Sequence, residues 1–171
     1  MNSTTSPEQD TVQLRQARVS DSKLLFDWAN EDEVRRMSFS PEPVLWVDHQ
    51  RWIAEKLGDR NCRIYIFLIR GKPAGQMRLE CVEVEVAEVD VHTSIAFRGR
   101  GWGGRFLRLG SEQFFREFPK VQTLRAVVRA DNLKSLRAFE KSGYKILERL
   151  RIKELDCWQL VNLRSRGAKD L

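Results

Sequence analysis

Residues 96–107 read AFRGRGWGGRFL and place four glycines and three arginines directly before a run with helical periodicity. Glycine lets the backbone turn tightly, so successive amide groups can point to one side with no Cβ in the way. The first amides of a helix have no partner within it and lie at the positive end of its dipole. Such a turn can hold an anion, and a diphosphate suits it because Arg98, Arg100 and Arg105 add positive charge.

Two common phosphate-binding motifs fit this segment poorly. The string GxxxxGK[ST] of a P-loop is absent from the sequence. Gly99, Gly101 and Gly104 do have the GxGxxG spacing of a dinucleotide-binding loop, but the strand before them comes late in the chain. In addition, Pro119 and Lys120 stand where that loop requires an acidic residue. A glycine-rich turn without any ligand is the alternative to an anion site.

Four polar side chains alternate with apolar residues just before this loop, at Glu88, Asp90, His92 and Ser94. Because the side chains of a strand alternate between its two faces, these four are expected to share one face. An imidazole that is neutral near pH 7 can accept a proton, so His92 is a candidate general base or water relay. Asp90 or Glu88 would orient His92 or bind a cationic substrate. The alternative is a strand whose polar face is simply solvated.

Hydrophobic periodicity indicates the elements that must hold these groups in place. Residues 31–38 continue the first predicted helix as a short helix or turn, and prolines then break the pattern. The predicted order is two helices, three strands, a helix, a strand, a helix and two strands. These elements cover residues 19–30, 46–59, 62–72, 74–81 and 88–95, then the helix that follows the glycine loop up to Pro119, and then residues 121–130, 131–143, 144–153 and 156–163.

The run VEVEVAEVDVHTSIAF at 82–97 would form one very long strand on propensity alone. Its apolar phase changes, however, because Val82, Val84 and Val86 are even-numbered whereas Val89 and Val91 are odd-numbered. A strand keeps one phase, since a slip of one residue moves every side chain to the other face. We therefore predict a connection or bulge at 82–87 and a strand at 88–95.

The composition is that of one globular domain. With 171 residues, 42% hydrophobic and 32% charged, the chain is long enough for a sizeable core. We expect a domain at 13–164, a flexible tail at 1–12 and a frayed end at 165–171. No apolar run approaches the ~20 residues needed to cross a bilayer, and the polar start lacks the features of a secretory signal.

Cysteine usage and net charge indicate which cofactors and partners fit the chain. Three widely separated cysteines and two histidines give no zinc or disulfide pattern, which favours a cytoplasmic protein without a metal. The formal net charge of +6 favours an anionic partner. Because 24 acidic residues are interleaved with 30 basic ones and no base-reading motif is present, a phosphorylated small molecule fits better than nucleic acid.

Two motifs carry a resemblance to a known family. RGRGWG at 98–103 resembles the R/Q-x-x-G-x-G/A pyrophosphate loop of the GNAT superfamily of acyl-CoA-dependent N-acetyltransferases. DNLKSLRAFEKSGYK at 131–145 is similar to that superfamily's next segment, N-x-x-S/A-x-x-x-Y-x-x-x-G-F/Y. One predicted helix and one predicted strand separate the two motifs, as in the family, and the resemblance covers about residues 14–163.

The resemblance implies a fold and a co-substrate. The fold is a GNAT-like α/β fold, with a central mixed sheet, helices on both faces and one parallel strand pair that splays apart. Acetyl-CoA is expected between the splayed strands, with pantetheine along the backbone near Thr93 and Ile95 and the diphosphate on the amides of 99–104. For Asn132 and Ser135, helix capping is the alternative to a cofactor contact. The expected cofactor-binding residues are Thr93, Ile95, Arg98, Gly99, Arg100, Gly101, Trp102, Gly103, Gly104, Asn132 and Ser135.

One position departs from the family pattern. The family's general acid is a tyrosine in the second motif, and this sequence has Phe139 there. Phenylalanine cannot donate a proton, so the thiolate leaves unassisted or Ser135, a water or another hydroxyl replaces the tyrosine. The candidate catalytic residues are therefore His92, Asp90 and Ser135, and Tyr144 is expected in the core.

The N-terminal third is similar to a subgroup that acts on nucleotide-linked amino sugars, of the pseudaminic-acid pathway type, with a W-x-N…V-R…S…H-x-x-W pattern. The matching positions assign Asn30, Arg35, Ser38, His49 and Trp52 to an acceptor site for the amine of a sugar nucleotide. Core packing is the alternative for Trp52, and a helix surface for His49. Two other functions stay open: a ribosomal-protein type N-terminal acetyltransferase, and a non-catalytic acyl-CoA-binding module. A homodimer is one of the oligomeric states that the sequence leaves open.

Overall fold

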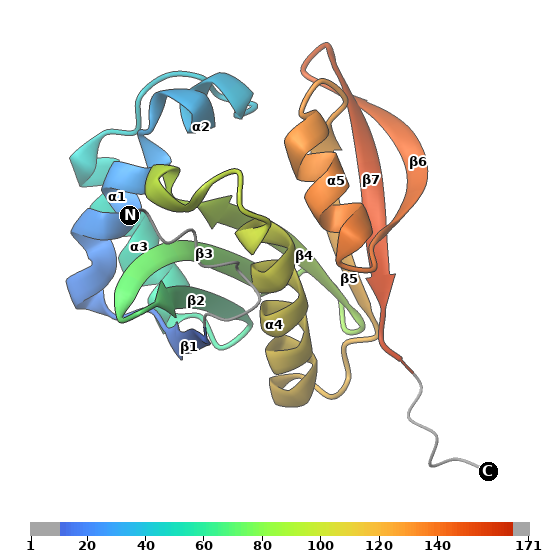
Figure 1. The fold of residues 1–171 in the computed structure, drawn as a ribbon, viewed down its shortest axis with the longest axis horizontal. Helices are drawn as coiled ribbons and strands as arrows, with labels where there is room; N and C mark the ends of the chain where they lie inside the picture. Colours follow the sequence, from blue (N-terminus) through green and yellow to red (C-terminus); the bar gives the residue numbers. More distant parts are fainter. Residues whose placement is uncertain (1–10, 166–171) are drawn as a thin grey trace, which may run out of the picture.

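A seven-stranded mixed sheet, with strand order β1-β2-β3-β4-β5-β7-β6, organises residues 11–165, which are those the computed structural model describes (Figure 1). All pairs are antiparallel except β4 with β5. The strands are β1 (Val12–Gln16), β2 (Cys62–Ile69), β3 (Lys72–Cys81), β4 (Val86–Thr93), β5 (Thr123–Arg129), β6 (Lys145–Ile152) and β7 (Leu155–Leu163). The α-helices are α1 (Ser22–Ala29), α2 (Asp32–Met37), α3 (Trp46–Gly58), α4 (Trp102–Glu117) and α5 (Leu133–Lys141).

The first strand, β1, was not predicted. It pairs antiparallel with β2 at the edge of the sheet. Val12, assigned to the N-terminal tail on sequence, is its first residue. Five residues are too few for the alternation of apolar and polar positions to stand out from the polar stretch before them. The remaining parts of the two predicted tails, 1–10 and 166–171, lie outside the described residues.

The hairpin between β3 and β4 confirms the argument from apolar phase. Met77 pairs with Val91 and Leu79 with Val89, so these apolar side chains share one face of the sheet. The connection occupies 82–85, and β4 starts at Val86. The predicted strand end was wrong, because β4 ends at Thr93 and Ile95 lies in a 3₁₀ turn.

The parallel pair β4–β5 is joined at one end only. Its register covers Val86 with Thr123, Ala87 with Leu124, and Glu88 with Arg125. Beyond these pairs, residues 89–93 of β4 keep β3 as their neighbour and residues 126–129 of β5 keep β7. We call these two unpaired edges the splay. The predicted GNAT-like fold, a mixed sheet with one splayed parallel pair, is confirmed.

Helices cover both faces of the sheet, as predicted (Figure 1). On one face, α4 packs its apolar stripe against β2, β3 and β4, with Phe106 stacked on Phe67 at a centroid distance of 4.4 Å. On the other face, α3 packs against β2 and α1 packs against α3. Gly75 of β3 lies where α4 and β4 come closest, because a Cβ there would be 2.4 Å from the carbonyl oxygen of His92 and 2.7 Å from the Phe106 ring.

We predict that Gly75→Ala lowers the free energy of unfolding by about 1–3 kcal/mol, because the added methyl group meets backbone and a buried ring. Urea-induced unfolding would measure the loss. Gly58→Ala is the matched control, since a Cβ at that helix end has nothing within 4 Å. Equal stability of the two variants would contradict the prediction.

Candidate active site

The glycine loop lies next to the open end of the splay. Gly99 and Gly101 have positive φ angles of 75° and 78°, which favour glycine. Gly101 is also the N-cap of α4, and no side chain caps that helix end. The first amides of this 16-residue helix therefore have no side-chain partner at the position where the sequence predicts an anion site.

The next two glycines lie where α4 meets its neighbours. A Cβ at Gly103 would lie 3.4 Å from Oγ1 of Thr93 and 3.8 Å from Cβ of Ala138 in α5. A Cβ at Gly104 would lie 3.6 Å from the carbonyl oxygen of Ala138. These contacts bring the beginning of α4 against the end of β4 and against α5, on the two sides of the splay.

The side chains of Arg98 and Trp102 contact other parts of the protein, whereas the sequence assigned both residues to cofactor binding. The guanidinium of Arg98 donates to the carbonyl oxygen of Thr93 at 2.8 Å, and to Glu33 and Glu31, so it turns away from the glycine turn. The Trp102 side chain is buried and stacks near Phe106, which leaves only its backbone amide for a ligand. Arg100 is exposed beside the turn. The guanidinium of Arg105 lies 4.9 Å from the centroid of the Trp102 ring.

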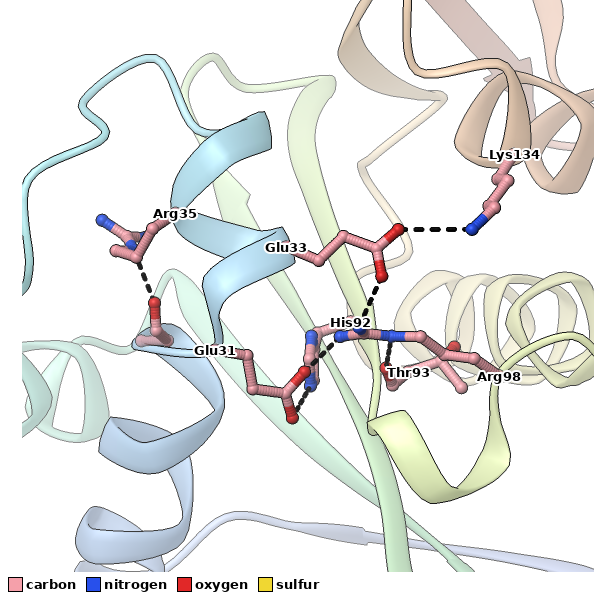
Figure 2. A network of polar contacts seen from close by, with 8 residues as sticks. Glu31, Glu33, Arg35, His92, Thr93, Arg98 and Lys134 are labelled. Carbon is pink, nitrogen blue, oxygen red and sulfur yellow. Dashed lines mark hydrogen bonds and ion pairs between the residues drawn. The ribbon is translucent and has the colours of Figure 1, made fainter.

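The structure adds two carboxylates that the sequence did not single out. Glu31 follows α1, Glu33 lies in α2, and both point toward Arg98 (Figure 2). Glu33 also forms an ion pair of 3.4 Å with Lys134 of α5. Burial raises the pKa of Glu31 despite Arg98, whereas the hydrogen bonds and charges of Lys134 and Arg98 outweigh burial and lower the pKa of Glu33. Acidic residues around a helix start are common, so no pattern in the sequence marked these two.

His92 lies on the predicted face of β4, opposite the valines and toward α1. Its ring centroid is 5.3 Å from that of Trp28, and its side chain is only 9% exposed. Burial, together with the charge of Arg98, lowers the pKa of His92 to about 4, so the ring is neutral at pH 7. The carboxylate next to it is Glu31, whose Oε1 is 3.5 Å from Nε2. Asp90 is exposed and receives a hydrogen bond from Gln76, so in this structure it does not orient His92.

The second motif forms the start of α5. Asn132 caps this helix, with its side-chain oxygen accepting from the amide of Ser135 at 3.2 Å. The Ser135 hydroxyl has no partner among residues 11–165. Phe139 is buried and packs edge-on against Tyr144, whose hydroxyl is 2.9 Å from the Ser111 hydroxyl. Tyr144 thus belongs to the core, as predicted.

Three of the predicted acceptor residues hold the loop between α2 and α3. Asn30 exchanges two hydrogen bonds with the backbone of Val44. Arg35 donates to the carbonyl oxygens of Ala29, Ser40 and Glu42, and Ser38 accepts from the amide of Ser40. Asn30 and Arg35 also line a surface groove of about 510 Å³, but their polar atoms are already used by the loop.

The other two predicted acceptor residues are packing residues of α3. His49 is buried, with Nε2 2.8 Å from the carbonyl oxygen of Ser22, so it ties α3 to α1. The prediction of His49 as a site residue was therefore wrong. Trp52 packs partly buried against the apolar cluster of α1 and α3, with the guanidinium of Arg78 5.8 Å from its ring centroid. Helical spacing alone did not distinguish packing from binding at either position.

Residues 31–36 cross the open end of the splay. Glu31 contacts the end of β4 through His92 and Arg98, whereas the carbonyl oxygen of Arg36 accepts from Arg129, the last residue of β5. Further along, Lys153 of the β6–β7 turn donates to Ser40 at 2.9 Å. The open end of the splay is therefore bordered by polar contacts between its two halves.

Residues 11–165 contain neither a candidate membrane span nor a candidate metal site. No helix there is long and apolar enough to cross a membrane. No group of three or more His, Cys, Asp or Glu side chains within the same residues could hold a metal ion. The three cysteines are free.

Comparison with known proteins identifies the family. The sequence profile of the acetyltransferase (GNAT) domain matches residues 11–145, which is most of the chain. Aminoglycoside N(6')-acetyltransferases type 1 of Klebsiella pneumoniae and Serratia marcescens are each 23% identical over 151 residues, which cover 80% of this chain and 75% of the relative.

Solved structures with the same fold include AAC(6')-Ib in complex with ribostamycin and coenzyme A, with a TM-score of 0.80, 21% identity and coverage of 95% of this chain and 100% of that one. Another is spermidine N-acetyltransferase of Vibrio cholerae in complex with CoA and spermine, with a TM-score of 0.80, 15% identity and coverage of 90% and 96%. These structures share the fold, and the profile match shows the family. The chain belongs to the acetyltransferase (GNAT) domain family, and the predicted class of N-acetyltransferase with acetyl-CoA as co-substrate is confirmed at that level.

Proposed function

We propose that this protein transfers the acetyl group of acetyl-CoA to a primary amine of an amino sugar. The observation that carries the proposal is the placement of a half-buried carboxylate, Glu31, beside His92 and the glycine loop at the open end of the splay. A carboxylate there suits a cationic amine, since an opposite charge within a few ångströms stabilises the ammonium form on binding.

The residues of the splay fit acetyl-CoA. The uncapped start of α4 and the two left-handed glycines offer amides to a diphosphate. The unpaired edges of β4 and β5 offer backbone donors and acceptors to the amides of pantetheine. Ile95, which is exposed, lies beside the glycine loop, and exposed Leu133 lies at the start of α5. Both side chains offer apolar contact to the cofactor. Bound there, acetyl-CoA supplies the activated acyl group, and the protein supplies positioning.

The charges favour an acceptor that binds through its amine rather than through a nucleotide. The sequence assigned Arg35 to the diphosphate of a sugar nucleotide, but three backbone carbonyls already occupy its guanidinium. Glu31, by contrast, adds negative charge beside His92 at the open end. We therefore propose an amino sugar as the acceptor, with a sugar nucleotide as the less supported form. The aminoglycoside enzymes among the relatives are in line with this choice.

The same border argues against a protein N-terminus as the acceptor. A peptide needs an open channel along which its backbone can lie. Residues 31–40 instead contact Arg129, Lys134 and Lys153 across the open end. A sugar amine needs only one group to reach the thioester, so the bordered site suits it better.

Because Phe139 cannot donate a proton, a non-catalytic acyl-CoA-binding module is the second candidate function. The Phe139 ring is buried and no hydroxyl replaces the family's tyrosine at that position. Ser135 lies one helical turn earlier on the same side of α5, and its unpartnered hydroxyl is our candidate for the proton donor to the leaving thiolate. Turnover with any amine separates the enzyme from the module.

We predict that Gly101→Ala weakens CoA binding about 5- to 30-fold, because a side chain destabilises the left-handed conformation by roughly 1–2 kcal/mol. Isothermal titration calorimetry with CoA would measure the change. Gly71→Ala is the matched control, since Gly71 has a similar φ of 74° in the turn before β3 and equally open surroundings. If the two variants bind CoA equally well, the diphosphate does not depend on this turn.

We predict acetylation of kanamycin and glucosamine, slower acetylation of a UDP-linked amino sugar, and none of a ribosomal-protein N-terminal peptide. CoA release, followed with a thiol reagent, would rank these acceptors by kcat/KM. N-acetylglucosamine is the control, because it has the same ring without a free amine. A preference for the peptide would contradict the proposal, and CoA binding without turnover on any amine would favour the module.

We predict that His92 makes folding more favourable at neutral pH than at acid pH. Its folded pKa of about 4 lies below the ordinary value of 6.5, so its contribution is present above pH 6.5 and is lost as the pH falls toward 4. Glu31, Arg98 and the Trp28 ring face it. The free energy of unfolding of the wild type should therefore fall more steeply over this range than that of His92→Gln. Parallel curves would contradict the lowered pKa.

A further inference from the structure

We propose that Oε1 of Glu31 and Nε2 of His92 together bind the acceptor's amine nitrogen, with Glu31 as the group that takes its proton. This inference rests on the proposed function and adds a catalytic residue to it. Glu31 does not belong to either motif that identified the family, and it comes from the junction of α1 and α2 rather than from the sheet.

The two atoms face each other without bonding. Nε2 of His92 is 3.5 Å from Oε1 of Glu31, and Nε2 is fully buried with no hydrogen-bond partner in the described part of the chain. A buried polar atom without a partner is costly, so it is rare unless something else completes it. A nitrogen that donates to both atoms, with each bond about 2.9 Å long, would stand at the apex of a triangle whose base is this 3.5 Å separation.

The surroundings hold the carboxylate beside the imidazole ring. Oε2 of Glu31 accepts from Arg98, which fixes the carboxylate and leaves Oε1 directed at His92 (Figure 2). The backbone amide of Ile95 gives Glu31 a further hydrogen bond. The ring of Trp28, 5.3 Å from that of His92, forms an apolar wall beside the pair. A pre-positioned carboxylate suits an ammonium group better than a freely rotating side chain.

The charges of the pair suit an amine that must lose a proton before it reacts. His92 is neutral at pH 7, so with its proton on Nδ1 it presents a lone pair at Nε2, and Glu31 provides the negative charge. In the step that we propose, an N–H bond of the ammonium group breaks and an O–H bond forms at Oε1 of Glu31. The amine is left neutral with its lone pair free, and Glu31 is left protonated. Burial favours this outcome, since it raises the pKa of Glu31.

The position of the pair connects it to the co-substrate. His92 comes directly before Thr93, the last residue of the unpaired β4 edge, and Arg98 joins Glu31 to the carbonyl oxygen of Thr93. An amine bound here therefore stands at the open end of the splay, on the face opposite α4.

Histidine-selective NMR tests the inference, because the chain has only two histidines. We predict that kanamycin moves the His92 ring signals of the wild type, with the ring in its Nδ1–H form, while the buried His49 signals stay in place as an internal control. In Glu31→Gln the shift should disappear at the same kanamycin concentration, and kcat/KM should fall about 100-fold or more.

Glu33→Gln is the matched control variant. It also removes a carboxylate from Arg98, but Glu33 makes no contact with His92. We expect its kanamycin-induced His92 shift to be that of the wild type. In Glu31→Gln the new side-chain amide keeps an oxygen that can accept from Arg98, and equal thermal midpoints of the two variants would show that both are folded.

The outcomes separate this inference from the proposed function. If the wild type acetylates kanamycin but His92 does not move, or if Glu31→Gln behaves like Glu33→Gln, the inference is overturned and the proposed function stands. If no amine is turned over and none shifts the His92 ring signals, both the inference and the proposed function are overturned. Loss of the shift and of turnover in Glu31→Gln alone supports the inference.

Discussion

The separation of β4 from β5 after three residue pairs is the constraint on which the rest of the structure depends. Each strand keeps its outer neighbour, β3 or β7, so the sheet stays continuous at one end and opens at the other. The two inner edges then carry backbone donors and acceptors without strand partners. Such groups need other partners when they are buried, and an extended ligand with amide groups can provide them as an added strand would.

Helix α4 links this opening to the proposed anion site. It packs on β2, β3 and β4 through an apolar stripe, and a glycine in β3 allows the closest approach. Its uncapped start therefore lies at the end of β4, with the glycine turn directly before it. Gly103 and Gly104 lie beside Thr93 and Ala138, so the end of β4 and helix α5 both lie next to this helix start.

The open end of the splay carries acidic side chains, although the whole chain has a positive net charge. The protein has a net charge of +6, but the open end of the splay holds Glu31 and Glu33 around Arg98. Partial burial strengthens these interactions relative to those of exposed pairs. The pKa values of the two carboxylates move in opposite directions. Burial raises the pKa of Glu31, whereas Lys134 and Arg98 together outweigh burial and lower the pKa of Glu33. The contact of Glu33 with Lys134 involves a lysine that is 87% exposed, and exposed ion pairs contribute little to stability. This contact therefore adds little to the stability of the border across the open end.

The sequence by itself determined the family, the order of elements from α1 onward, the break in phase between β3 and β4, and the glycine turn at the start of α4. These features are local, because they depend on periodicity and on the conformational freedom of glycine. It also placed His92 on the correct face of its strand. Only the tertiary structure decided which carboxylate meets His92, that Arg98 turns toward Glu31, and that His49 is a packing residue. Those contacts join residues up to 67 positions apart, and side-chain direction at such separations follows from packing between elements rather than from any local pattern.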